Sequence, residues 1–361
     1  MKKQFYLPVL KSKQGEFDAL FKLDTNIKKH TVPLFEITPI EFDNSIAEKP
    51  KTIETHLNNF CKKVEKKWAL NELFIDTHLI TNERPSEKDC FEYIFDILFE
   101  KKINPIPVVR IDSSINLINS INLIFLLYPI SQIAIRVTIS DLLNTEINTE
   151  VEKLLESLSI DPQNCHLIID LKDADFTNYD DFADGILDSL KVFPRLRQWN
   201  TISICCAAFP ATSLLEKGLS TVPRNDWKFY TSLIDKIDLE ELDIQINYGD
   251  YGIVASGYFE FDPKKMSRSA NIRYTHNNVW FISKGNKLKK SEDFKQYLTQ
   301  TQDIVKSRYY LGETFSAGDL HIKKCSEGTV STGNPTVWNW VGNNHHFTKV
   351  VSDLVANNFF S

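Results

Sequence analysis

Short apolar runs recur along the first two-thirds of the chain. Each is followed by a polar or charged residue and then by a stretch with helical periodicity. The runs are apolar almost without interruption, which is typical of parallel strands buried on both faces. They predict eight strands, at Phe5–Lys11, Val32–Ile37, Leu73–Asp76, Pro105–Ile111, Ile133–Thr138, His166–Leu171, Ile202–Ala207 and Ile244–Tyr248.

The segments between these runs carry apolar residues at helical spacing. Lys51–Leu70, for example, places Ile53, Leu57, Phe60 and Val64 on one face of a helix. The alternation of strands and helices indicates a parallel sheet with helical crossovers. Similar patterns predict helices at Glu16–Lys29, Cys90–Lys101, Val151–Leu158 and Phe182–Phe193.

Eight such units predict an α/β fold, a (β/α)8 TIM-like barrel, which routinely fills about 250 residues as one domain. The alternative is an open, doubly wound sheet, which usually has a glycine-rich loop after its first strand. Here the first turn, Ser12–Gly15, holds a single glycine. The barrel is therefore the favoured fold.

The pattern changes after Gly252. Strands at Asn271–Thr275 and Val279–Ser283 predict a hairpin, Ser291–Tyr309 predicts a helix, and Asn334-Pro335 is a typical start for a last helix. We therefore divide the chain into a barrel at 1–252 and a C-terminal α+β extension at 253–361, packed on the barrel. Within the last helix, His345 and His346 point about 100° apart, so we expect one to be buried and the other exposed.

The composition narrows the expected location of the protein and the kinds of partner and site that it can have. The 361 residues are 42% hydrophobic and 25% charged, with a net charge of -6, which predicts a full core and no overall basic surface for nucleic acid. The start of the chain lacks the apolar region and cleavage site of a signal peptide, and the apolar stretch 121–130 is too short to span a membrane. We expect a cytoplasmic protein without membrane contact. Six cysteines without C-x-x-C spacing favour neither a disulfide framework nor structural zinc.

Charged residues stand at the ends of most predicted strands, where barrels of this type bind their ligands. Arg110 and Arg136 suit an anionic group, and Glu36, Asp76 and Asp170 suit a divalent cation or acid–base chemistry. The alternative is an internal ion-pair layer that binds no ligand, and the sequence leaves both interpretations open. The candidate ligand-binding residues are Lys11, Glu36, Asp76, Arg110, Arg136, Asp170, Asp250 and, from the last helix, His345.

Several weaker signals also have simpler structural explanations. Asp76 and His78 could share a metal, but a hydrogen-bonded loop start is favoured. Cys205-Cys206 is expected to pack in the core. Basic segments at 264–268 and 284–290 around an aromatic hairpin could bind single-stranded nucleic acid, although solvated loops are the commoner meaning. P-loop, G-x-S-x-G and H-E-x-x-H motifs are absent, so no reaction is assigned.

Two blocks carry a resemblance that runs from end to end of the chain. FYLPVLKSKQGEFDAL with VPLFEITP, and FSAGDLHIKKCSEGTVSTGNPTVWNWVGNNHHFTKVV, resemble the Beta protein family, which takes its name from a satellite-bacteriophage protein. The resemblance implies a bacterial or mobile-element context associated with phage defence or toxin neutralisation. It identifies neither a catalytic residue nor a cofactor.

Two functions of different classes follow. In the first, the protein binds a partner from a defence gene cluster, with the aromatic residues Trp227, Phe229 and Tyr230 expected at the surface. In the second, the charged mouth binds a phosphorylated or nucleotide-like small molecule, as an enzyme or a sensor. If the last helix closes over the mouth, Lys11 and His345 would line one pocket. We place the first ahead for biological role, and nucleic acid is not expected as a partner.

Overall fold

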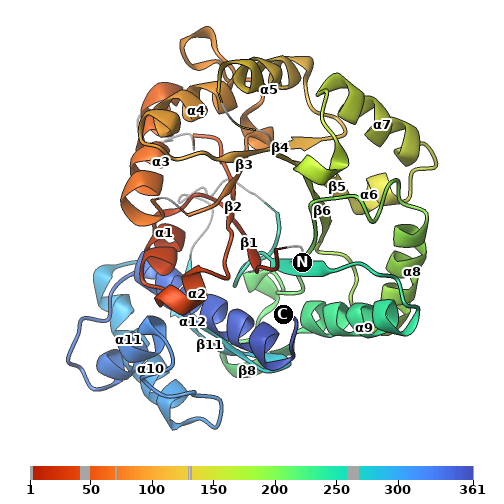
Figure 1. Ribbon diagram of the computed structural model, residues 1–361. Helices are drawn as coiled ribbons and strands as arrows, with labels where there is room; N and C mark the ends of the chain where they lie inside the picture. The colour runs from red at the N-terminus through yellow and green to blue at the C-terminus, as the bar shows by residue number, and fades with distance from the viewer. Residues whose placement is uncertain are drawn as a thin grey trace.

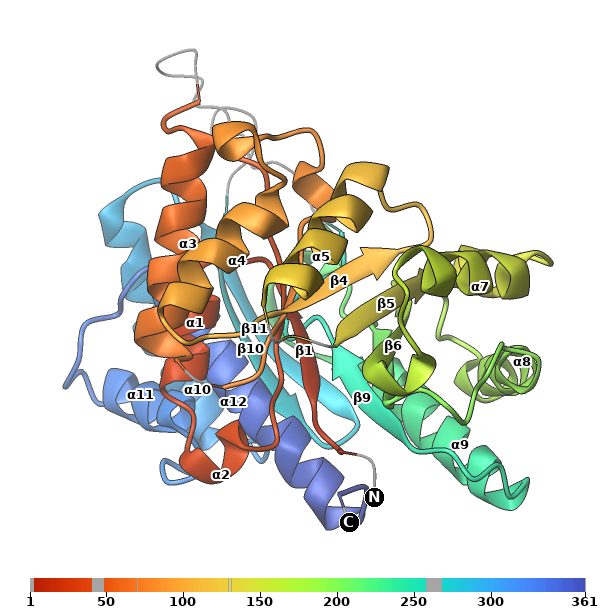
Figure 2. The same ribbon diagram turned by 45° about the horizontal axis from the view of Figure 1, so that its top comes forward.

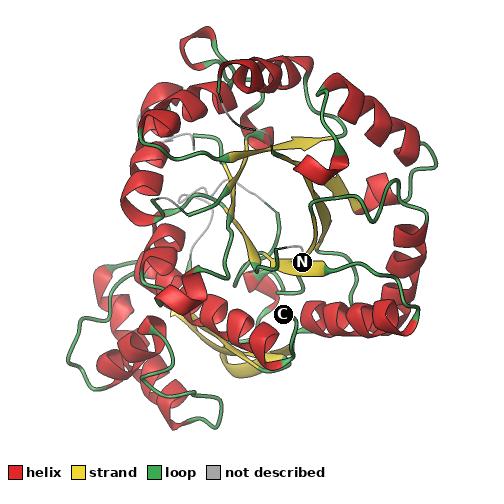
Figure 3. Cartoon of the chain, viewed as in Figure 1, coloured by secondary structure: helices red, strands yellow, loops and turns green. Residues whose placement is uncertain are grey.

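Eight parallel strands form a closed barrel in the computed structural model, which describes residues 3–40, 49–69, 71–128, 130, 132–257 and 268–360. Each strand pairs with the next, and the last pairs with the first through Leu7 and Gly249. The predicted (β/α)8 barrel is confirmed (Figure 3). The strands are β1 (Leu7–Leu10), β2 (Leu34–Glu36), β3 (Phe74–Asp76), β4 (Ile106–Arg110), β5 (Ile133–Thr138), β6 (Cys165–Lys172), β7 (Thr201–Cys206) and β9 (Ile246–Asp250).

Helices surround this barrel as a ring (Figure 1). Several begin at a side chain that accepts a hydrogen bond from the first helical turn: Thr52, Asp89 and Ser114 each do so. Asp24 caps a separate short helix in the same way, so the stretch predicted as one helix from residue 16 to 29 is two. The ring comprises α1 (Gln14–Phe21), α2 (Thr25–Lys28), α3 (Ile53–Lys67), α4 (Cys90–Glu100), α5 (Ile115–Leu127), α6 (Ile139–Leu142), α7 (Ile147–Ser157), α8 (Tyr179–Lys191) and α9 (Asn225–Leu239).

A second, antiparallel sheet lies beside the barrel. The predicted hairpin is present as β10 (Ser269–His276) and β11 (Val279–Lys287), and a third strand, β8 (Gly218–Pro223), pairs with β11. β8 comes from the chain between the last two barrel strands and was not predicted. Its exposed and half-buried positions alternate, unlike the continuous apolar runs of the barrel.

The described part of the extension also contains the helices α10 (Gln296–Lys306), α11 (Ala317–Ser326) and α12 (Pro335–Ala356). Asn334 caps α12 as predicted, accepting from the backbone N–H groups of Thr336 and Val337. Figures 1 and 2 show α12 beside α1 and running toward α9. Phe347, Val350 and Leu354 share the core between the barrel strands and the helices. α12 therefore occupies the place of the eighth barrel helix, and the division of the chain at residue 252 stays a prediction.

The core has two concentric parts. Side chains that point into the barrel form a small cluster that includes Leu7, Leu34 and Val108, and those that point outward form the large cluster under the helices. Trp227, Phe229 and Tyr230, expected at the surface, are buried in that outer cluster. The expectation was wrong because α9 turns this face toward the barrel. No helix within the described ranges is long and apolar enough to cross a membrane.

Candidate functional site

Six of the predicted residues form one layer at the mouth of the barrel. Lys11, Glu36, Asp76, Arg110, Arg136 and Asp170 come from the ends of six successive strands, and all six are buried. Each lies two residues after a side chain of the inner cluster, such as Leu34 before Glu36 and Val108 before Arg110. Because side chains alternate across a strand, all six point into the barrel.

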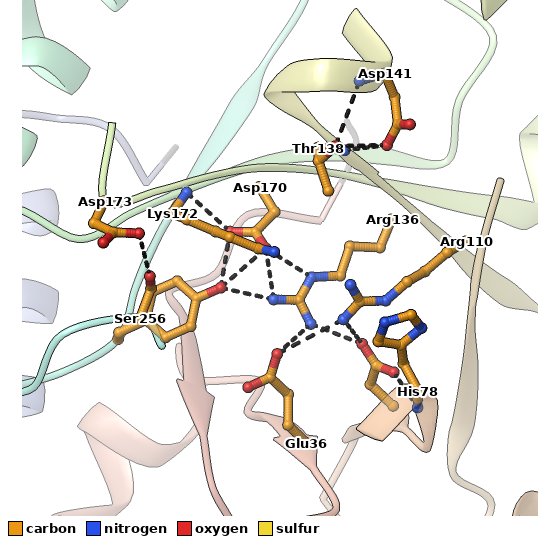
Figure 4. Close-up of polar contacts among 12 residues, drawn as sticks. Glu36, His78, Arg110, Arg136, Thr138, Asp141, Asp170, Lys172, Asp173 and Ser256 are labelled. Carbon is orange, nitrogen blue, oxygen red and sulfur yellow. Dashed lines mark hydrogen bonds and ion pairs between the residues drawn. The ribbon is translucent and has the colours of Figure 1, made fainter. Parts of the chain in front are cut away.

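Arg136 is the centre of this layer (Figure 4). Its Nε and Nη2 donate to Asp170 at 3.1 and 2.7 Å, and its Nη1 donates to Glu36 at 2.8 Å and to Asp76 at 2.7 Å. Nη2 also donates to the hydroxyl of Tyr251 at 2.7 Å. A guanidinium has five N–H groups, so these contacts engage every donor of Arg136. Arg136 has nothing left to offer a ligand, although the sequence suggested it as an anion-binding residue.

Asp76 is held ionised by its two arginine partners. Burial alone would raise the pKa of Asp76, but the guanidiniums of Arg110 and Arg136 outweigh burial and lower it to about 2. Burial alone would lower the pKa of Arg136, and Asp170, Glu36 and Asp76 instead hold it well above its usual value. The layer is therefore a set of three cations and three carboxylates with no formal net charge.

Lys11 and Arg110 complete the layer at its edge. Lys11 bonds to Glu36 and lies 5.3 Å from the ring centre of Tyr251. Arg110 donates to Asp76 at 2.6 Å and lies 3.7 Å from Glu36. The candidate ligand residues thus form an ion-pair layer themselves. One set of residues therefore fits both interpretations that the sequence left open. The role of these residues in ligand binding stays a prediction.

Asp250 does not belong to this layer. It lies on the outer face of β9, on the same side as Tyr248 of the outer core. Its carboxylate accepts from the hydroxyl of Tyr6 at 2.5 Å and lies 2.8 Å from Nε2 of His346. Asp250 thus connects the barrel wall to α12.

His345 is also placed away from the mouth. Its Nδ1 lies 2.8 Å from Asp319, its Nε2 lies 2.8 Å from the carbonyl of Thr275, and its ring stacks on Tyr274. All these partners belong to the extension, and no contact joins His345 to Lys11 among those described. The expectation that either His345 or His346 would be exposed was wrong. Both are fully buried because α12 has the barrel on one side and β10 on another.

The remaining candidates have structural surroundings. Asp76 accepts from the backbone N–H of His78 at 2.9 Å, which is the hydrogen-bonded loop start that was favoured. Cys205 and Cys206 are buried as expected, and burial raises the pKa of both thiols. No group of three or more His, Cys, Asp or Glu side chains that could hold a metal occurs in the described part of the chain. Of the predicted basic segments, residues 264–267 lie outside the described residues.

Tyr251 is the member of the site that the sequence analysis missed. Its hydroxyl donates to Asp170 at 2.9 Å while accepting from Arg136. The predicted last strand ended at Tyr248, and Asp250 was chosen as its charged end. The signal that was available is the alternation itself, because Tyr251 and Asp250 must point to opposite faces.

A separate surface feature lies on α5, which stands between α4 and α7 in the ring (Figure 1). The helix INLINSINLIFLL contains no charged residue. Leu126 is 84% exposed and Leu127 63%, and Ile115 and Leu123 are exposed on the same side. A groove of about 600 Å³ lies beside the first half of α5, between Asn116, Asn119 and Ser120 of α5 and charged residues near the start of α4: Arg84, Glu87, Lys88, Asp89 and Glu92. We name the four apolar residues Ile115, Leu123, Leu126 and Leu127 the α5 face.

Comparison with known families agrees with the resemblance seen in the sequence. The sequence model of the Beta protein family matches residues 6–352, nearly the whole chain. The chain belongs to the Beta protein family. No curated protein matches the sequence. The match includes every residue of the mouth layer and the α5 face, so both belong to the family's region of the chain.

Proposed function

We propose that this member of the Beta protein family acts by binding a partner protein through the α5 face, as a component of an antiviral defence or toxin-neutralising module. The observation that carries the proposal is the uncharged helix α5, on which four large apolar side chains are exposed. Exposed apolar residues that gather on one face are typical of interaction sites. The barrel behind them is a rigid support.

The surroundings of the α5 face favour a protein over a lipid surface. Helices that lie on membranes carry Lys and Arg on their polar face, whereas the polar positions of α5 are asparagines and serine. The neighbouring groove presents both signs of charge, because Arg84 and Lys88 line it together with Glu87 and Glu92. A partner segment with apolar anchors and polar, mixed-charge ends is complementary to this arrangement.

Co-purification from the native gene cluster tests the proposal. Cells would express the tagged protein with and without phage infection, as wild type, as Leu126→Asp with Leu127→Asp, and as Leu239→Asp. Leu239 is the matched control because it is 83% exposed at the end of α9. Substitutions at such exposed positions change stability little.

We expect one protein to co-elute with the wild type and with the Leu239 variant, and to be lost with the α5 variant. A chain that elutes alone in every condition contradicts the proposal. Equal recovery of the partner with the α5 variant contradicts the assignment of the face. Recovery of a second copy of this chain in place of a different protein would show self-association instead.

A further inference from the structure

The acceptors of the mouth layer are all in use. Glu36 accepts from Arg136 with one carboxylate oxygen and from Lys11 with the other. Asp76 accepts from the backbone of His78 with one oxygen and from Arg110 and Arg136 with the other. Asp170 accepts from the hydroxyl of Tyr251 and the backbone N–H of Lys172 with one oxygen, and from Arg136 with the other. Each of the six carboxylate oxygens therefore already accepts at least one hydrogen bond.

The donors are not all in use. Nε of Arg110 is buried and has no hydrogen-bond partner among the described residues, although the side chain is only 9% exposed. Lys11 carries three N–H groups and has a single acidic partner, Glu36. A buried donor without a partner is destabilising, and such groups in native proteins bind water or a ligand. The group that this layer lacks is therefore an acceptor.

The side chains of Lys11 and Arg110 both lie beside the carboxylate of Glu36. Lys11 bonds to Oε2 of Glu36, and Nη2 of Arg110 lies 3.7 Å from Oε1. Both side chains keep a small exposed fraction, whereas Arg136 has none. A molecule entering the mouth from solvent thus meets Lys11 and Arg110 before it meets Arg136.

We propose that the barrel mouth binds a small oxyanion, the phosphate group of a small molecule, through Lys11 and Arg110. A guanidinium and an ammonium are the two side-chain groups that bind phosphate most often. The oxygens of a tetrahedral phosphate point in several directions, so they can accept hydrogen bonds from the side chains of Lys11 and Arg110 at once. Arg136 is a positioning residue in this site: it holds Glu36 and Asp76 in place and touches no ligand.

A thermal-shift titration with inorganic phosphate tests this site, with sodium chloride used to keep the ionic strength constant. The variants are Arg110→Gln, Lys11→Gln and, as a control, Lys153→Gln, an exposed lysine on α7. A ligand that binds only the folded protein raises the melting temperature. We expect a rise of several degrees for the wild type and the Lys153 variant, and none for the other two.

Each alternative result counts against the site. No rise for the wild type, or a full rise for Lys11→Gln, overturns it, and an equal rise with acetate overturns the choice of phosphate. Should Arg110→Gln fail to fold by circular dichroism, Lys11→Gln decides alone. The Leu126→Asp, Leu127→Asp variant is expected to keep its response to phosphate, so the failure of this site and the failure of partner binding are distinguishable.

Discussion

Arg136 and Asp170 face each other across 2.7 Å at the barrel mouth, and neither side chain has any exposed surface. An ion pair so deeply buried is stabilising only if its remaining hydrogen-bonding groups are satisfied. Glu36, Asp76 and Tyr251 supply those partners. The central pair of the mouth is therefore part of the structure of the barrel, and its ligand-binding capacity lies at the edge.

Removal of Arg136 tests this interpretation. We expect Arg136→Met to lower the free energy of unfolding by about 3–5 kcal/mol, because three carboxylates would lose their shared partner in the interior. Urea denaturation measures the change. Lys191→Met is the control, since the Lys191–Glu240 pair is partly exposed and such pairs contribute about 0–1 kcal/mol. Equal losses for the two variants would show that the mouth layer is not a structural centre.

Acid should weaken the fold through the same layer. In the folded protein the pKa of Asp76 is lowered from 3.8 to about 2. A carboxylate whose pKa is lowered in the folded state stabilises the fold at pH values above its unfolded-state pKa. This contribution is lost as the pH falls through the folded-state pKa. Between pH 4 and 2 we expect the loss of roughly 2 kcal/mol from this group.

The measurement is urea denaturation at several pH values, for the wild type and for Asp76→Asn. The comparison is needed because burial raises the pKa of Asp226, which gives a contribution of the opposite sign. The Asn variant is expected to lose less stability than the wild type over this interval. Parallel pH profiles for the two proteins would contradict the assignment to Asp76.

Two helical glycines give a matched test of how α11 packs on α12. A Cβ atom at Gly318 would lie 2.4 Å from the backbone oxygen of Val341, whereas nothing lies within 4 Å of one at Gly185. We expect Gly318→Ala to destabilise the protein by about 1–3 kcal/mol and Gly185→Ala to stabilise it by about 0.4–1 kcal/mol. Melting temperatures report both changes. A Gly318 variant as stable as the wild type would mean that the two helices are not in close contact.

The barrel was predictable because its strands are buried on both faces and therefore have a strong apolar signal. All eight predicted strands are present. β8 was missed because it pairs at the edge of a small sheet, where one face stays exposed and the apolar signal is weak. The burial of Trp227 was not predicted either, because it depends on which face of α9 is turned toward the barrel.

The site was predictable in part for the same reason. Continuous apolar strands show where a strand ends but not which side chains point inward, so Asp250 was grouped with residues that face the opposite way. His345 and His346 follow helical geometry, yet the sequence does not show that α12 is covered on two sides. Charge at strand ends predicts a polar mouth, but which donor pairs with which acceptor depends on the three-dimensional arrangement of the side chains.

Site-specific photo-crosslinking in cells tests the central claim, that the α5 face binds a partner protein. A photoreactive phenylalanine analogue would replace Leu126 in one strain and Leu239 in another, since both side chains are exposed to a similar extent. We expect a discrete adduct of higher mass with the probe at 126 and none with the probe at 239. The absence of any adduct at 126, or the same adduct at both positions, would contradict it.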